Sequence, residues 1–219
     1  MELGYFGDKI VPFSGVRADM RFPAISEVRA YWEALRNGRK VPLRSEIDPR
    51  GIERALEYAF VLERIAPNVS RFRLAGMHLN DLMGMEVRGM PVTAFFTPAS
   101  RPEASGIIEN VFRTPQIAEM TLGGETAFGK PPMAARLIIL PLQSDLGDIS
   151  RALGCLVADG AVGRTPRRFD LVSAAITTIE TGKAGFLPVP ARGFAESQGP
   201  IDGEPKGDRS HLRLVKTDK

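Results

Sequence analysis

Residues 70–98, SRFRLAGMHLNDLMGMEVRGMPVTAFFTP, place the tightest limit on the fold. The stretch opens with a short alternating run, 72–75, which predicts a strand that stops at Gly76. Leucines, methionines and a valine then recur at three- and four-residue spacing, interrupted by Gly84 and Gly89, which predicts short helical turns. Turns of this length are unstable alone, so we expect them to lie against a sheet.

Strand patterns lie on both sides of this stretch. Residues 57–65 are rich in β-forming side chains and predict a strand that pairs with 70–76 as a hairpin. Three more strands are predicted over 117–128, 133–142 and 149–159. The first of these contains a Gly-Gly pair and is either one bent strand or a tight hairpin. The pattern predicts an α+β fold, with a five-stranded antiparallel sheet and short helices across one face.

The run LIILPL within residues 133–142 shows no alternation of apolar and polar side chains. A strand that is apolar on both sides is covered on both faces of its sheet. The short helices provide one cover, and the other is the 26–36 helix, a partner subunit, or both. A further β-rich segment, 169–181, is a possible extra strand at the sheet edge.

Residues 26–36, SEVRAYWEALR, have the clearest helical pattern in the chain. Ser26 is the predicted N-cap, and one apolar stripe must be buried on the body or against a second subunit. That stripe, the candidate dimer interface, consists of Val28, Tyr31, Trp32 and Leu35. Residues 48–56, with Asp48 as cap, and residues 101–113 predict two more helices.

These patterns divide the chain into a core with flanking segments. Residues 1–25 are expected to form an irregular lead-in, and residues 26–56 the N-terminal flanking helices. The core covers residues 57–160 and is followed by a possible extra strand within 161–182 and a flexible C-terminal tail at 183–219.

Charge and cysteine content narrow the classes of function. Residues 160–219 hold ten of the 29 Lys and Arg and seven of the 26 Asp and Glu, which leaves nineteen of each for residues 1–159. A neutral body argues against a nucleic-acid-binding domain, which carries a basic face. The single cysteine excludes an intramolecular disulfide, and no apolar run is long enough to span a membrane. Because the N-terminus also lacks the pattern of a signal peptide, we expect a cytoplasmic protein without membrane insertion.

The order of the predicted elements over residues 57–160 resembles that of a PAS domain: a hairpin, short helices, a longer helix and about three antiparallel strands. Many PAS domains also carry, after the second strand, a glycine, a leucine-bearing turn, a Leu-x-Gly step and a proline-containing segment. The corresponding residues here are Gly76, Leu79, Leu82, Gly84, Gly89, Pro91 and Pro98.

One particular PAS family shows a closer resemblance. The segment RLAGMHLNDLMGMEVRGMPVTAFF, with the upstream YWEALR and VPLRSEIDP, is similar to the alphaproteobacterial PAS-type proteins first catalogued as a domain of unknown function. The resemblance covers residues 26–180. It implies a stand-alone PAS protein that senses a ligand or relays signals by dimerising and by contacting other signalling proteins.

The helical turns and the sheet could enclose a ligand. Four of the eight methionines lie in 77–90, and methionine suits a pocket that adapts to an apolar guest, although the same side chains could simply fill the core. The candidate pocket residues are His78, Leu82, Met83, Met90, Phe95, Ile138, Leu140 and Cys155.

No cofactor or metal is predicted. PAS domains that bind haem usually do so through a histidine on the longer helix, and 101–113 contains none. Photosensing PAS domains use a flavin-reactive cysteine in an Asn-Cys-Arg-Phe-Leu setting, whereas Cys155 lies in the apolar run GCLVA and is expected to be buried and inert. The chain also lacks a G-x-S-x-G elbow, a phosphate-binding loop and any His/Cys set with ligand spacing, so we expect no enzyme.

The run 163–168, GRTPRR, is the one local basic cluster. It could contact nucleic acid, an acidic partner or a cyclic dinucleotide, but a solvated linker is the favoured interpretation. The leading hypothesis is a dimeric regulatory module that acts through protein contacts. The alternative is a small-molecule sensor with an apolar ligand between the turns and the sheet, and the weakest is a nucleic-acid-binding regulator.

Overall fold

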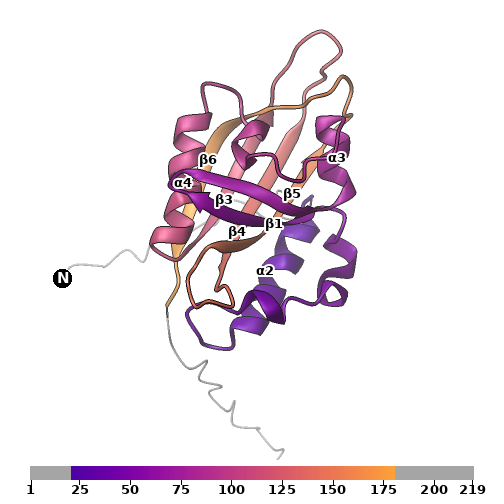
Figure 1. Ribbon diagram of the computed structural model, residues 1–219. Helices are drawn as coiled ribbons and strands as arrows, with labels where there is room; N and C mark the ends of the chain where they lie inside the picture. Colours follow the sequence, from indigo (N-terminus) through magenta and orange to yellow (C-terminus); the bar gives the residue numbers. More distant parts are fainter. Residues whose placement is uncertain (1–20, 181–219) are drawn as a thin grey trace, which may run out of the picture. The chain divides into compact units, whose positions relative to one another are not determined.

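The computed structural model describes residues 21–180, in which helices lie on both sides of an antiparallel sheet (Figure 1). In chain order the elements are α2 (Pro23–Arg36), the 3₁₀-helices η1 (Arg44–Glu46) and η2 (Pro49–Ala55), β1 (Ala59–Ala66), β2 (Val69–Ala75), α3 (Met77–Met83), η3 (Val92–Phe95), α4 (Arg101–Arg113), β3 (Gln116–Gly124), β4 (Ala134–Leu142), β5 (Arg151–Asp159) and β6 (Phe169–Thr178).

The sheet has six strands in the order β2-β1-β5-β4-β3-β6, and every neighbouring pair is antiparallel. The α+β class and the antiparallel sheet are therefore confirmed, and the sheet consists of the five predicted strands and one more. The possible extra strand exists as β6, which pairs with β3 along 169–178 and forms one edge of the sheet. The segment predicted as a bent strand or a hairpin is the single strand β3. The predicted lead-in before residue 21 and the predicted tail at 183–219 lie outside the described residues.

One face of the sheet, which we call the inner face, is covered by α3, η3 and α4. Leu82 of α3, Phe95 of η3 and Ile108 of α4 pack in one cluster with side chains from the strands. The helix α3 ends where the sequence predicts, at Gly84, whose φ of 71° is a left-handed conformation that favours glycine.

The opposite face, the outer face, is covered by α2 and η2. Helix α2 begins at Pro23 rather than at the predicted cap Ser26, because proline is favoured at the first helical position. Trp32 is fully buried against the sheet, and its indole N–H donates a 2.9 Å hydrogen bond to the carbonyl of Pro141. The apolar run in β4 is thus covered on both faces, as predicted.

A β-bulge interrupts the β1–β2 hairpin. Val61 pairs with Leu74 and Leu62 pairs with Phe72, so Arg73 is an extra residue in β2. Phe72 lies in the inner core, whereas Leu74 faces outward beside Val61. A simple alternation over 72–75 would have placed Phe72 and Leu74 on the same face, and the bulge prevents this.

Within residues 21–180, no helix has the length and apolar character required to cross a membrane.

Candidate functional site

Five of the eight predicted pocket residues lie on or between α3 and η3, which cover the inner face: His78, Leu82, Met83, Met90 and Phe95. Leu82, Met83 and Phe95 are buried in the inner core, and Met90 packs against it. Phe72 makes edge-to-face contacts with the rings of Phe60 and Phe95, at centroid distances of 5.2 and 5.4 Å. These side chains pack against one another, and of those named here only Phe60 also lines a part of the groove described below.

The other predicted pocket residues face the opposite side of the sheet. Ile138, Leu140 and Cys155 belong to the outer core with Trp32, and Ile138 pairs directly with Cys155 across β4 and β5. Successive side chains of a strand alternate between faces, so the β4 residues that reach the inner core are Ala135, Leu137 and Ile139. The prediction of one pocket with all eight residues is therefore wrong.

His78, the fifth of the inner-side candidates, joins α3 to β5. Its Nε2 accepts a 3.1 Å hydrogen bond from the backbone N–H of Ala158, and its ring meets that of Tyr58 edge-on at 4.9 Å. Burial lowers the pKa of the imidazole, which favours the neutral form that can accept this bond. The geometry gives His78 a structural role.

Cys155 is buried on the outer face. Burial raises the pKa of its thiol to about 12, so almost no reactive thiolate exists at neutral pH. The expected burial of the cysteine is confirmed, and the raised pKa agrees with the expectation that the thiol is inert.

The predicted interface stripe on α2 is used mostly within the protomer. Val28 and Trp32 are fully buried against the sheet. Tyr31 is half-buried, and its hydroxyl accepts a hydrogen bond from the backbone N–H of Asp48 at 2.7 Å. A partner could reach only Tyr31 and Leu35 of the four residues without unpacking the helix. The prediction that this stripe is a dimer interface is therefore corrected: Val28 and Trp32 are buried by the protein's own sheet.

The basic cluster 163–168 is not a uniformly solvated linker. Arg167 is fully buried, and its guanidinium donates 2.7 Å hydrogen bonds to the carbonyls of Val162 and Pro131. Its backbone N–H also donates to the carbonyl of Leu82 at 2.7 Å, which ties this loop to α3. Arg164, by contrast, is exposed. The buried Arg167 and its hydrogen bonds were not predicted from the sequence. The composition of a basic run does not indicate which of its arginines is buried.

A second buried charge links the β1–β2 hairpin to α4. The Glu109 carboxylate accepts a 2.6 Å hydrogen bond from Nη2 of Arg64 and a 2.9 Å hydrogen bond from the backbone N–H of Asn68. The hydrogen bonds from Arg64 are the main reason that the pKa of Glu109 lies below its ordinary value, and burial opposes them. Sequence reasoning also missed this pair, because the two side chains lie on elements far apart in the chain.

Replacement of Glu109 by Gln should lower the free energy of unfolding at pH 7 by about 2 kcal/mol, because Arg64 loses its charged partner while remaining partly solvated. A carboxyl whose pKa is depressed on folding stabilises the protein above its unfolded pKa, and this stability is lost as the pH falls through and below about 4.3. The variant should therefore lose less stability than the parent on acidification. Urea unfolding at pH 7 and pH 4 measures both effects. The exposed Glu103→Gln on the same helix is the control, and equal acid sensitivity of parent and Glu109→Gln would contradict the assignment.

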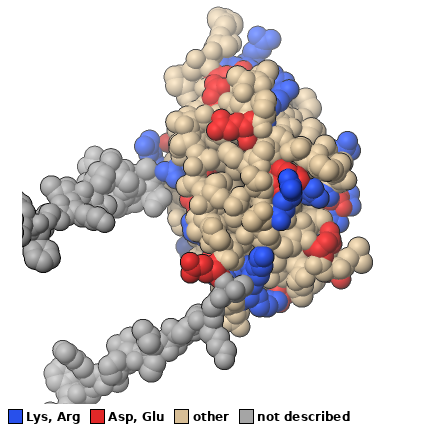
Figure 2. All heavy atoms as spheres, turned by 90° about the vertical axis from the view of Figure 1, so that its left-hand side faces the viewer, with Lys and Arg blue, Asp and Glu red and all other residues tan. Residues whose placement is uncertain are grey.

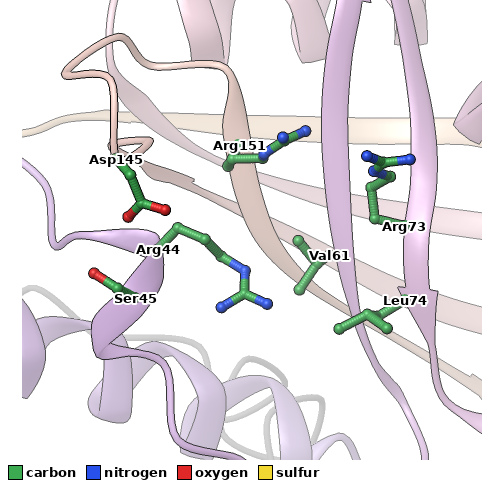
Figure 3. Close-up of a pocket in the computed structure, with 7 residues that line it drawn as sticks. All are labelled: Arg44, Ser45, Val61, Arg73, Leu74, Asp145 and Arg151. Carbon is green, nitrogen blue, oxygen red and sulfur yellow. The ribbon is translucent and has the colours of Figure 1, made fainter.

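A groove on the outer face, beside the β1–β2 hairpin, combines a polar part with an adjoining apolar part. Its first part has a volume of about 330 Å³ and is lined by Arg44, Ser45, Val61, Arg73, Leu74, Asp145 and Arg151 (Figure 3). Its second part, of about 200 Å³, is lined mainly by apolar residues of η2, β1 and β2 and of the segments next to them. The two parts share Arg44, Val61 and Leu74, so they adjoin.

At the polar end of the groove, ion pairs between neighbouring strands hold the side chains of Arg73 and Arg151 in place. Glu63 of β1 forms ion pairs with Arg73 of β2, at 2.7 Å, and with Arg151 of β5. Arg44 is fixed at the backbone, where its N–H donates a 2.8 Å hydrogen bond to the carbonyl of Gln143. Figure 3 shows the Arg44 side chain reaching toward Val61 and Leu74. The arrangement can hold an anionic group beside an apolar surface, and it offers no nucleophile–base pair.

The family model of the PAS domain matches residues 20–157, which is more than half of the chain, and the chain therefore belongs to the PAS domain family. This confirms the family-level resemblance and agrees with the observed sheet and its helical cover. Family membership indicates a sensory or regulatory module.

Two solved structures that match the chain are distant from it in sequence. The light-state structure of the blue-light photoreceptor Aureochrome1 LOV is 14% identical, with a TM-score of 0.39 over 51% of this chain and 88% of that chain. A structure of an RNA-binding Light-Oxygen-Voltage receptor is 13% identical, with a TM-score of 0.36 over 72% of this chain and 36% of that chain. Likeness at this level carries no argument about ligand or activity. No curated protein matches the chain.

Proposed function

We propose that this chain is a non-enzymatic PAS-type regulatory module of the alphaproteobacterial kind, which acts in the cytoplasm by binding protein partners, the first of them a second copy of itself. The PAS family supports the regulatory role. The observation that carries the proposal is the exposure of β6 at the edge of the sheet.

Among residues 21–180, no strand pairs with the outer edge of β6. Its first residues are covered, because the N–H of Thr97 donates to the carbonyl of Phe169 and the N–H of Leu171 donates to Oγ of Ser100, both at 3.0 Å. Among residues 21–180, the only strand paired with β6 beyond this point is β3. Residues 172–178 are exposed, and Val172 and Ile176 have 66% and 45% of their surface accessible.

A bulge at Val172, where the pairing of β6 with β3 shifts register, can hinder strand addition, but beyond it the edge carries no charge and no proline. Natural edge strands are protected by lysines, prolines or short length, but 171–178 is LVSAAITT, with no charge and no proline. Figure 2 shows the side of the molecule on which α4 and β6 lie, where a broad uncharged area separates scattered acidic and basic side chains. A two-fold pairing of identical antiparallel edges is self-complementary, which favours a second copy as the first occupant.

Replacement of Ile176 by Lys should weaken self-association by at least about tenfold in Kd, because a two-fold contact buries the new charge twice. Sedimentation velocity across micromolar concentrations measures the change. Ile65→Lys is the matched control, since Ile65 is the same residue type with 48% exposure, on β1 away from β6. A strict monomer for the parent chain, or equal weakening by both variants, would contradict association through β6.

We do not propose nucleic-acid binding through residues 163–168, because the guanidinium of Arg167 already donates hydrogen bonds to the carbonyls of Val162 and Pro131. The proposed lack of enzymatic activity rests on the missing catalytic motifs in the sequence.

A further inference from the structure

The β-bulge in β2 builds the groove on the outer face. Because Arg73 is the extra residue, Arg73 and Leu74 both line the groove although they are consecutive in sequence. In a regular strand one of the two would point to the inner core. Bulges often re-aim side chains next to functional sites. This bulge places a cation and a large apolar side chain side by side at the junction of the polar and apolar parts.

The polar end carries more positive than negative charge. Three arginines, Arg44, Arg73 and Arg151, face two carboxylates, Glu63 and Asp145. Glu63 is shared between two of the arginines. The ion pairs formed among residues 21–180 do not include Arg44. Figure 3 shows its guanidinium turned away from the Asp145 carboxylate and toward the apolar part of the groove.

The apolar end presents exposed surface that the fold itself does not use. Leu74 and Leu56 have 54% and 45% of their surface accessible, although both lie beside well-packed residues. Other apolar lining residues include Ile47 on the η1–η2 connection, Ile52 on η2 and Leu153 on β5. A guest in this part would be enclosed between the connection and the sheet.

We propose that this groove binds a small amphipathic anion, a medium-chain carboxylate whose head group lies at Arg44 and Arg73 and whose apolar chain lies along Leu74 and Leu56. A carboxylate supplies a counter-charge that Arg44 does not receive from any ion pair among residues 21–180, and it accepts hydrogen bonds from a guanidinium fork. The two parts of the groove have volumes of about 330 and 200 Å³, which together fall within the range of small-ligand sites. The site lies on the face opposite the inner pocket expected from the sequence, and away from β6.

Titration calorimetry of the full chain with decanoate, below its micelle concentration, tests the proposal. Decanoate should bind more tightly than hexanoate, by roughly fourfold for each added methylene while the apolar part still has room. Decanol, which lacks the charge, should bind at least about tenfold more weakly. Binding should weaken as salt is raised, because the head-group site is partly open to solvent.

Two variants with opposite expected effects locate the site. Arg44→Gln should weaken decanoate binding by about tenfold, and Asp145→Asn should strengthen it by a few-fold, because the loop carboxylate repels the ligand. Both positions are on surface segments, so the fold should tolerate the changes. Arg54→Gln, an exposed arginine on η2 that does not line the groove, is the matched control and should bind like the parent.

Three outcomes would overturn the proposal. They are no heat of binding with decanoate, binding that Arg44→Gln and Asp145→Asn leave unchanged, and co-sedimentation with phosphatidylglycerol vesicles without binding of free decanoate. The last result would assign the arginines to a membrane surface. Ile176→Lys should retain parent-like decanoate affinity, so failure of the groove proposal and failure of the β6 proposal remain distinguishable.

Discussion

Replacement of Trp32 by Ala should lower the free energy of unfolding by about 3–5 kcal/mol, one of the two largest effects expected in this protein. Trp32 is fully buried between α2 and the outer face of the sheet, and it also hydrogen-bonds the carbonyl of Pro141. Removal of the ring leaves a large cavity and an unpaired buried carbonyl. Urea unfolding followed by far-UV circular dichroism measures the loss, because the variant no longer contains a tryptophan for fluorescence.

Two further variants separate the contributions of packing and hydrogen bonding. Trp32→Phe keeps most of the ring but lacks the N–H donor, so it should cost less than Trp32→Ala, about 2 kcal/mol. Leu35→Ala removes a half-buried member of the same stripe and should cost about 1 kcal/mol. If Trp32→Ala left stability unchanged and altered only the oligomeric state, the stripe would be an interface, as the sequence suggested, and the packing of α2 described above would be wrong.

Replacement of Arg167 by Met should lower the free energy of unfolding by about 3 kcal/mol. The methionine can fill most of the space, but it cannot donate to the carbonyls of Val162 and Pro131, which stay buried. Thermal unfolding and urea unfolding measure the effect on the full chain. The Trp32 fluorescence gives a second readout, because that side chain is retained.

Arg164→Met is the matched control for this change. Arg164 belongs to the same basic run and is exposed, so its replacement should change stability by less than about 0.5 kcal/mol. Equal stability of the two variants would show that Arg167 is solvated, and it would restore the linker interpretation of 163–168.

The strand and helix pattern could be predicted well from the sequence, because period-2 and period-3.6 alternation directly reflect which side chains are buried. The unbroken apolar run in β4 predicted cover on both faces, and α2 provides the outer cover. The helix at 101–113 was predicted with its observed bounds. The extra strand at 169–181 was less certain because its side chains are exposed on both faces, so burial left no pattern.

The candidate site was harder to predict, because it depends on register and on long-range contacts. Ile138, Leu140 and Cys155 were grouped with the inner turns because their apolar character alone does not say which face they occupy. The bulge at Arg73 reverses the direction of Leu74, and no residue type in FRLA signals it. The groove joins η1, the β1–β2 hairpin and the β4–β5 loop, whose proximity only the folded sheet establishes.

The most direct test of the central claim, association through β6, is amide hydrogen exchange of the full chain at increasing protein concentration. In an edge strand about half of the N–H groups point away from the sheet and exchange readily until another strand binds them. The β6 proposal predicts that amides within residues 172–178 become more protected as concentration rises through the micromolar range, while those of β2, the opposite edge, do not change. Concentration-independent exchange along β6, or new protection confined to β2 or α2, would contradict it.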